Sequence, residues 1–496
     1  MAEILALDLG STQLKLLVLD EQARVTYVDS EGYPTRAPRA GWLEQDPQDW
    51  PAALARGMKK LCGTHGTEKL AGVCFSGHMS GVVLLDAAGE VLYPCILLSD
   101  SRSDAQCVRL RAQVGELVRR RTGNPVVNAF SLPKLVWLKE NEPERWRRTR
   151  VWLSPKDYLR KCLTGTAATE YTDAYNSLCI ASDTADWCAD ILHAAGLEAE
   201  KFPPVLAPTA PAGRVTAQAA AQFGLPAGLP VYAGGADMAC GAVGMGLYAI
   251  GRSALTLGTC ATFLVPVPRV ESACFGEVTF HLHATPGLLY ALGSHFNGGL
   301  AANWSCRMLS DSGELDFARM DALSRAAQDI APGSDGVLTV PFLAGSGSPY
   351  FDADDRQTVL GVSAATTRAH LFRSELEGIT CNLLQTKRVF DSLLPGGLQR
   401  VLLGGGGAKI GVWPQMIADV FGTDIDLVSN TDASAVGAAI LGGVGAGIFA
   451  DAPSAAEKCL TVKNTLICDA AAHAQYARVF ERYLRACEGV RALGLV

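Results

Sequence analysis

The fold is decided near the start of the chain, by residues 4–19, which read ILALDLGSTQLKLLVL. The apolar run at residues 4–7 predicts a buried strand, the polar group at residues 8–12 a turn, and residues 14–19 a second strand. A carboxylate at a strand end, followed by glycine and two hydroxyls, suits a site where Asp8 holds a metal ion and the turn meets phosphate oxygens. The same residue types also form ordinary turns, so this stretch alone leaves both interpretations open.

A second stretch repeats this pattern in the later half of the chain. Residues 254–257 predict an apolar strand, Gly258-Thr259-Cys260-Ala261 a turn, and residues 262–265 another strand. Such an echo indicates two related lobes, and a chain of 496 residues is too long for one core. We predict a boundary after residue 246. Strands and helices alternate between these points, with a helix expected at 47–62 after Asp46, a buried strand at 70–76 and a hairpin over 82–98, so the chain is of the α/β class.

The composition excludes several functional classes. The formal net charge of -7 gives no bulk attraction for nucleic acid or an anionic membrane. The N-terminus has no basic start typical of a signal peptide. Residues 433–450 carry no charge, but their many Gly and Ala residues predict a tightly packed core helix rather than a membrane span. The 15 Cys include no Cys-x-x-Cys pair, which predicts reduced thiols and a cytoplasmic protein.

Two further stretches carry candidate chemistry. Residues 401–409, VLLGGGGAK, predict a strand that runs into four glycines and lets a nucleotide approach the backbone. No Gly-x4-Gly-Lys-Ser/Thr motif is present, which excludes a P-loop enzyme. Residues 233–242, AGGADMACGA, predict a strand that ends in Gly-Gly and presents Asp237 at a helix start. Asp237 is either a helix N-cap or, in a kinase, the base that takes the proton from the attacking hydroxyl.

Taken in order, these four stretches resemble the FGGY carbohydrate kinases, which are relatives of actin and hexokinase in fold. Similar segments include Gly41-Trp42-Leu43-Glu44-Gln45-Asp46-Pro47, Pro133-Lys134-Leu135-Val136-Trp137-Leu138 and Ser154-Pro155-Lys156-Asp157-Tyr158-Leu159. The likeness covers nearly the whole chain and is strongest to the xylulokinases within the family. It implies a two-lobed, ribonuclease H-like ATPase fold of the actin/hexokinase type, with ligands in the cleft between an N-terminal sugar and metal lobe (1–246) and a C-terminal nucleotide lobe (247–496).

Carried over by position, the resemblance assigns roles to individual residues. It makes Asp237 the general base and places Asp8 at Mg²⁺. The residues expected at the phosphates and the adenosine of ATP are Thr12, Gly258, Thr259, Asn303, Gly405, Gly406 and Ala408. The residues expected at the sugar are His78, Met79, Ser80, Asp100 and Asp237.

The sugar end departs from the family pattern. Xylulokinases usually carry Gly-Gln-Met-His-Gly where this chain has Gly77-His78-Met79-Ser80-Gly81, and the Asn that usually follows the base is Met238. His78 is therefore either a substitute sugar ligand or a core residue.

The resemblance implies ATP-dependent phosphorylation of a ketopentose, with D-xylulose as the leading acceptor. Another ketose or polyol (L-ribulose, a hexulose, glycerol or erythritol), a non-catalytic nucleotide or sugar sensor, and a filament-forming actin relative stay open, as does a homodimer. We expect no nucleic-acid or membrane partner.

Overall fold

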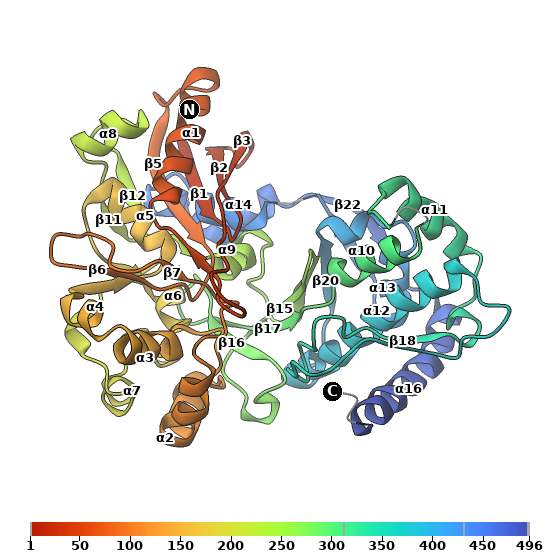
Figure 1. The fold of residues 1–496 in the computed structure, drawn as a ribbon. Helices are drawn as coiled ribbons and strands as arrows, with labels where there is room; N and C mark the ends of the chain where they lie inside the picture. Colours follow the sequence, from red (N-terminus) through yellow and green to blue (C-terminus); the bar gives the residue numbers. More distant parts are fainter. Residues whose placement is uncertain (1, 311–312, 430–431, 494–496) are drawn as a thin grey trace. The chain divides into compact units, whose positions relative to one another are not determined.

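A computed structural model describes residues 2–310, 313–429 and 432–493 (Figure 1). The chain forms two compact units. The first comprises the residues up to Tyr248 together with Phe280–Leu289 and Asp432–Leu460. The second comprises Ala249–Thr279, Tyr290–Thr431 and the residues from Thr461 onward. The α/β class is confirmed, and the division into lobes after residue 246 stays a prediction.

The first unit is built on a sheet with the strand order β11-β12-β5-β1-β2-β3, in which β13 also pairs with β5. Strands β1 and β5 are parallel, whereas β1 and β2 form the antiparallel hairpin expected from residues 4–19. The strands of this unit are β1 (Glu3–Leu9), β2 (Gln13–Asp20), β3 (Val25–Gly32), β4 (Glu44–Gln45), β5 (Leu70–Gly77), β6 (Val83–Leu85), β7 (Cys95–Ile96), β8 (Val151–Leu153), β9 (Thr169–Glu170), β10 (Val205–Leu206), β11 (Pro211–Arg214), β12 (Pro230–Tyr232) and β13 (Gly235–Ala236).

Helices cover both faces of this sheet. Gly57 of α1 lies against Leu16, whereas Gly442 of α14 lies against Ile4 and Cys74. Because successive side chains of a strand point to opposite faces, α1 packs on the face of Leu5, Leu7 and Leu9 and α14 on the face of Ile4, Ala6 and Asp8. The helices of this unit are α1 (Asp49–Thr64), α2 (Asp104–Thr122), α3 (Ser131–Asn141), α4 (Pro143–Arg148), α5 (Pro155–Thr164), α6 (Tyr171–Tyr175), α7 (Ala189–Ala194), α8 (Ala217–Phe223), α9 (Asp237–Gly244), α14 (Ala433–Gly445) and α15 (Ala452–Cys459).

The second unit contains a sheet whose strands run in the order β17-β15-β14-β20-β21-β22. Strands β14 and β15 form the predicted second hairpin, and β14 is parallel to β20. The strands are β14 (Arg252–Leu257), β15 (Ala261–Val267), β17 (Leu289–His295), β18 (Leu338–Val340), β19 (Thr358–Leu360), β20 (Arg400–Gly404), β21 (Ile425–Val428) and β22 (Val462–Leu466). The helices are α10 (Gly299–Met308), α11 (Phe317–Gln328), α12 (Arg368–Leu393), α13 (Trp413–Phe421) and α16 (Ala470–Ala492). Strand β16 (Thr279–Leu282) lies where the chain passes between the units.

The hairpin expected over 82–98 is present as isolated antiparallel bridges, Leu85 with Val91 and Val82 with Ile96, on either side of the Ala88-Gly89 turn. Its regular strands pair elsewhere, β6 with β8 and β7 with β4. One local prediction, the start of the first helix, is wrong. Helix α1 begins at Asp49 rather than after Asp46, whose carboxylate instead accepts the Gln48 N–H at 3.0 Å in the preceding turn. Helix α14 is the buried small-residue helix predicted at residues 433–450. Among the described residues, no helix has both the length and the apolar character needed to cross a membrane.

Candidate active site

Three parallel strand ends of the first unit bring the sugar and metal candidates together. In the register, Asp8 of β1 lies beside Ser76 of β5, and Gly235 of β13 lies beside Ser76 from the other side. The His78 N–H donates to the Leu9 carbonyl at 2.8 Å, which continues the pairing beyond the strand end. Asp237 follows β13 directly as the first residue of α9. Asp8, His78 and Asp237 therefore emerge from neighbouring strands at one edge of one sheet.

Asp8 lies near one positively charged side chain, Lys15, and one negatively charged side chain, Asp432. Its Oδ1 atom is buried and has no hydrogen-bond partner. Burial raises the pKa of Asp8, while the Ser76 hydroxyl and the Lys15 ammonium oppose that rise and the Asp432 carboxylate adds to it. Lys15 lies opposite Asp8 in the β1–β2 register and forms an ion pair of 2.5 Å with Asp432. An unpartnered carboxylate oxygen beside a lysine is a suitable place for a hydrated cation and a phosphate.

The pKa of Asp237 lies well above that of an ordinary aspartate. Burial raises its pKa to about 8, the negative charge of Asp8 adds to the rise, and the hydrogen bond from the Met238 N–H opposes it. That N–H donates to Oδ1 at 2.7 Å. A carboxylate with a pKa near the working pH accepts a proton from a hydroxyl far more effectively than an ordinary aspartate does. The N-cap of α9 is Ala236, so Asp237 does not serve as that helix's N-cap.

Two of the residues expected at the sugar, His78 and Ser80, are buried beside Lys134. Ser80 has φ of +64°, an uncommon backbone conformation for a residue other than glycine, and its hydroxyl donates to the Asn176 carbonyl at 3.2 Å. The buried Lys134 ammonium contacts the carbonyls of Ser80 and Phe130, both at 3.3 Å, and burial lowers its pKa to about 7. His78 is buried, its Nε2 atom has no hydrogen-bond partner, and burial together with the charge of Lys134 lowers its pKa to about 4.

Met79 and Asp100, two further sugar candidates of the first unit, are both buried among protein groups. The Asp100 Oδ2 atom accepts both the Leu43 N–H at 2.6 Å and the Arg102 guanidinium at 2.7 Å. Arg102 also donates to Asp100 Oδ1 at 2.8 Å and lies 3.9 Å from the Trp42 ring centroid. These contacts tie Asp100 to the segment around Trp42, and its contact with a sugar stays a prediction.

In the second unit, the ends of the parallel strands β14 and β20 bring the nucleotide candidates together. The N–H groups of Gly299 and Leu300, at the start of α10, donate to the carbonyls of Gly258 and Thr259 at 2.7 and 2.9 Å. Gly405 has φ of +91°, and a Cβ atom there would lie 2.6 Å from the Leu257 carbonyl oxygen, so only glycine fits.

Of the remaining nucleotide candidates, two follow β20, one lies in α10 and one lies in the first unit. Gly406 has open space where a side chain would be, and Ala408 follows it in a short 3₁₀-helix, Gly406–Lys409. Asn303 lies one turn into α10. Thr12 is exposed in the β1–β2 turn of the first unit.

The residues fit one Mg²⁺ ion only in part. Among the described residues, no group of three His, Cys, Asp or Glu side chains is arranged to hold a metal ion. Mg²⁺ in phosphoryl-transfer enzymes is held by one or two carboxylates together with substrate phosphates and water. The Oδ1 atom of Asp8, which has no hydrogen-bond partner, could serve as the single protein carboxylate in such a site.

Sequence reasoning missed three residues of this site: Lys15, Lys134 and Asp432. Lys15 had a signal, because a hairpin with a turn at residues 10–12 places residue 15 opposite residue 8. Asp432 had none, since it is 417 positions from its partner Lys15.

The chain matches known proteins over most of its length. Residues 3–244 match the FGGY family of carbohydrate kinases, N-terminal domain, and residues 253–446 match the C-terminal domain of that family. A xylulose kinase of Bacillus subtilis is 32% identical over 485 residues, which cover 97% of this chain and 96% of the relative. A xylulose kinase of Escherichia coli is 31% identical over 445 residues, covering 89% and 90% of the two chains.

A solved structure agrees with the sequence relatives. The crystal structure of a xylulose kinase from Rhodospirillum rubrum has a TM-score of 0.92 and 28% identity, and the match covers 99% of each chain. The actin-like two-lobed fold class predicted from the sequence is confirmed by this likeness. The chain, with a sugar and ATP as its substrates, therefore belongs to the FGGY family of carbohydrate kinases.

Proposed function

We propose that this carbohydrate kinase transfers the γ-phosphoryl group of ATP to the terminal hydroxyl of D-xylulose in its open form and releases ADP and D-xylulose 5-phosphate. The names of its relatives support this acceptor. The observation that carries the proposal is the position of Asp237, a carboxylate with a raised pKa, at the start of α9 directly after β13. Strand β13 pairs with β5, which carries Ser76, and β5 pairs in turn with β1, which carries Asp8.

In this proposal, Asp237 accepts the proton of the attacking hydroxyl while it aligns that oxygen with the γ-phosphorus. Lys15 offsets phosphate charge when it leaves Asp432 for the nucleotide. Asp8 would hold Mg²⁺, and the ion, when bound, would supply positive charge against the phosphates. The remaining contacts with ATP come from the backbone-rich turns, namely Thr12, Gly258, Thr259, Gly405, Gly406 and Ala408, with Asn303 nearby.

The sugar in this proposal lies against His78, Met79, Ser80 and Asp100. The His78 Nε2 atom supports this placement, because a buried ring nitrogen without a partner is costly unless a ligand supplies one. A hydroxyl donating to Nε2 would remove that cost. The neutral ring is the form that accepts such a bond, and the lowered pKa of His78 keeps the ring neutral at pH 7.

A coupled assay of ADP release tests the acceptor. D-xylulose, L-ribulose, glycerol and erythritol are compared at equal concentrations, with a reaction without sugar as the baseline. The proposal expects kcat/KM to be highest for D-xylulose and the phosphate to appear on its terminal carbon by ³¹P NMR. A higher kcat/KM for another acceptor contradicts the choice of sugar, and the absence of sugar-stimulated ADP release contradicts the kinase itself.

The compartment and the assembly are also proposals. All 15 cysteines are free thiols, which supports a reducing, cytoplasmic location. The homodimer stays a prediction, and sedimentation velocity of the purified protein tests it.

A further inference from the structure

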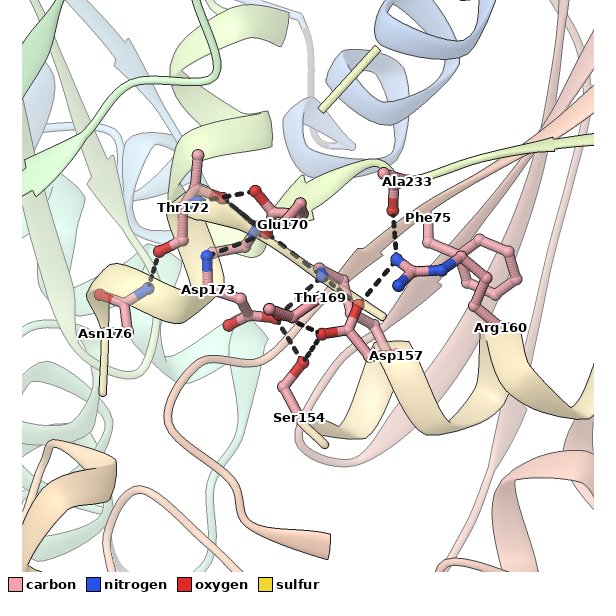
Figure 2. Close-up of polar contacts among 12 residues, drawn as sticks. Phe75, Ser154, Asp157, Arg160, Thr169, Glu170, Thr172, Asp173, Asn176 and Ala233 are labelled. Carbon is pink, nitrogen blue, oxygen red and sulfur yellow. Dashed lines mark hydrogen bonds and ion pairs between the residues drawn. The ribbon is translucent and has the colours of Figure 1, made fainter. Parts of the chain in front are cut away.

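A cluster of fully buried charges lies in the first unit, between α5 and the segment β9–α6 (Figure 2). The cluster consists of Lys156, Asp157, Arg160, Glu170 and Asp173, and each of these side chains has 0% exposure. The Lys156 ammonium lies 2.7 Å from Asp157, 3.0 Å from Asp173 and 3.2 Å from Glu170. Arg160 lies 2.7 Å from Asp157. None of these residues has a place in the proposed phosphoryl transfer.

Stability alone is a poor explanation for such a cluster. Removing five charges from water costs several kcal/mol per ion, and buried ion pairs often stabilise a fold no better than apolar side chains of similar size. The cluster brings three carboxyl groups to two cations, burial raises the pKa of Asp173 to about 7, and the Asp173 Oδ1 atom has no hydrogen-bond partner. A buried polar cluster of this kind is better explained by what it holds in place.

The cluster holds both ends of the turn that precedes Asp237. At one end, Arg160 donates from Nη1 to the Ala233 carbonyl at 2.9 Å, as Figure 2 shows. At the other end, the Ala236 N–H donates to the Thr172 hydroxyl at 2.9 Å. That hydroxyl in turn donates to Glu170 at 2.9 Å.

The turn between these anchors is pressed against the sheet. Gly234 has φ of +78°, and a Cβ atom there would lie 1.8 Å from the Phe75 carbonyl oxygen. The turn is therefore fixed at three points: Gly234 packs against Phe75 of β5, the Ala233 carbonyl accepts from Arg160, and the Ala236 N–H donates to Thr172. Asp237 directly follows Ala236, so these three contacts determine where its carboxylate lies.

We infer that Thr172 and Arg160 are positioning residues for Asp237, held in place by the buried cluster of Lys156, Asp157, Glu170 and Asp173. The inference rests on the proposed role of Asp237 as the base. Thr172 carries it most directly, because its hydroxyl accepts from Ala236 and donates to Glu170 at the same time. Without this hydroxyl, the buried Ala236 N–H has no acceptor and the start of α9 shifts to find one.

The test uses three substitutions of buried threonines. Thr172→Val removes the hydroxyl at nearly constant volume, and Thr172→Ser keeps it. Thr169→Val is the matched control, because the Thr169 hydroxyl donates to Asp157 in the same cluster, at 2.6 Å, but does not reach the turn. A displacement of about 1 Å in a reacting group costs about 10²-fold. We expect Thr172→Val to lower kcat by about 10- to 100-fold with the KM for ATP unchanged, and the other two variants to stay within about threefold of the unaltered enzyme.

A double-mutant cycle separates positioning from structural damage. If Thr172 acts through Asp237, then Thr172→Val causes no further loss in the background of Asp237→Asn. An undiminished loss in that background, or an equal loss from Thr169→Val, overturns the inference. Full activity of Thr172→Val overturns it as well. Near-normal activity of Asp237→Asn alone refutes the proposed base instead, so the two failures are distinguishable.

Circular dichroism is used to check whether each variant folds. If Thr172→Val does not fold, Thr172→Ala is judged by the same cycle. A loss above about threefold that vanishes in the Asp237→Asn background supports the inference, and any other result overturns it.

Discussion

Replacing Asp237 by Asn is expected to lower activity and raise stability at the same time. The amide has nearly the same shape and keeps an oxygen for the Met238 N–H, which donates to Oδ1 at 2.7 Å. It cannot take a proton from the sugar hydroxyl. Loss of a general base costs about 10²–10⁴-fold in kcat.

The gain in stability follows from the raised pKa of Asp237, about 8 in the folded protein against an ordinary value of 3.8. Between these two values, the folded protein keeps a proton that the unfolded protein releases. The free energy of unfolding of the unaltered protein therefore falls as pH rises through this window, by up to about 1.4 kcal/mol per pH unit. The Asn side chain does not titrate, so the free energy of unfolding of Asp237→Asn does not fall with pH for this reason. Between pH 5.5 and 7.5 the advantage of the variant grows by about 1–3 kcal/mol.

Thermal unfolding of both proteins over this pH range measures the effect. For a unit of this size, 1 kcal/mol corresponds to roughly 2–4 °C in Tm, so the Tm difference should widen by several degrees from pH 5.5 to 7.5. The control is Asp20→Asn. Burial raises the pKa of Asp20, but hydrogen bonds from the backbone and side chain of Arg24 and from the Gln22 N–H outweigh that effect and hold it below its ordinary value.

Stability contributed by Asp20 is present above its unfolded pKa and is lost only as pH falls through its folded pKa. Asp20→Asn should therefore lower Tm by an amount that stays constant between pH 5.5 and 7.5. A Tm difference for Asp237→Asn that is constant over this range, or that favours the unaltered protein, refutes the reasoning.

Three further predictions concern the neighbouring groups. Asp8→Ala should weaken the dependence of kcat on Mg²⁺, while sugar binding, measured by calorimetry, stays intact. Because the charge of Asp8 raises the pKa of Asp237, the rising limb of the pH profile of kcat/KM for the sugar should also move to lower pH. Lys15→Met should raise the KM for ATP about 10-fold or more with the KM for sugar unchanged, since one charge-assisted contact with phosphate contributes about 1.5–3 kcal/mol. Ser80→His with Met238→Asn should raise the ratio of kcat/KM for D-xylulose to that for other acceptors, because these side chains restore hydrogen-bonding groups worth about 0.5–1.5 kcal/mol each; an unchanged ratio contradicts the assignment of Ser80 to the sugar site.

Local sequence determined the two hairpins and the glycine-rich strand end. The alternation of apolar and polar residues at 4–19 corresponds to β1 and β2, and the later echo at 254–265 corresponds to β14 and β15. Each of these features depends on residues that are neighbours along the chain. Hydrophobic period and turn chemistry act over a few residues, so a single sequence carries enough information to predict them.

Only the tertiary structure decided which of these pieces meet. Asp8 and Asp237 come to one sheet edge because β5 pairs with both β1 and β13, and no periodicity in the sequence encodes that order. The pairing of Lys15 with Asp432 and the cluster around Lys156 likewise join segments that are separate in the sequence. The raised pKa of Asp237 follows from burial and from the charge of Asp8. Both causes are properties of the space around a side chain, which forms only when distant segments pack and exclude water.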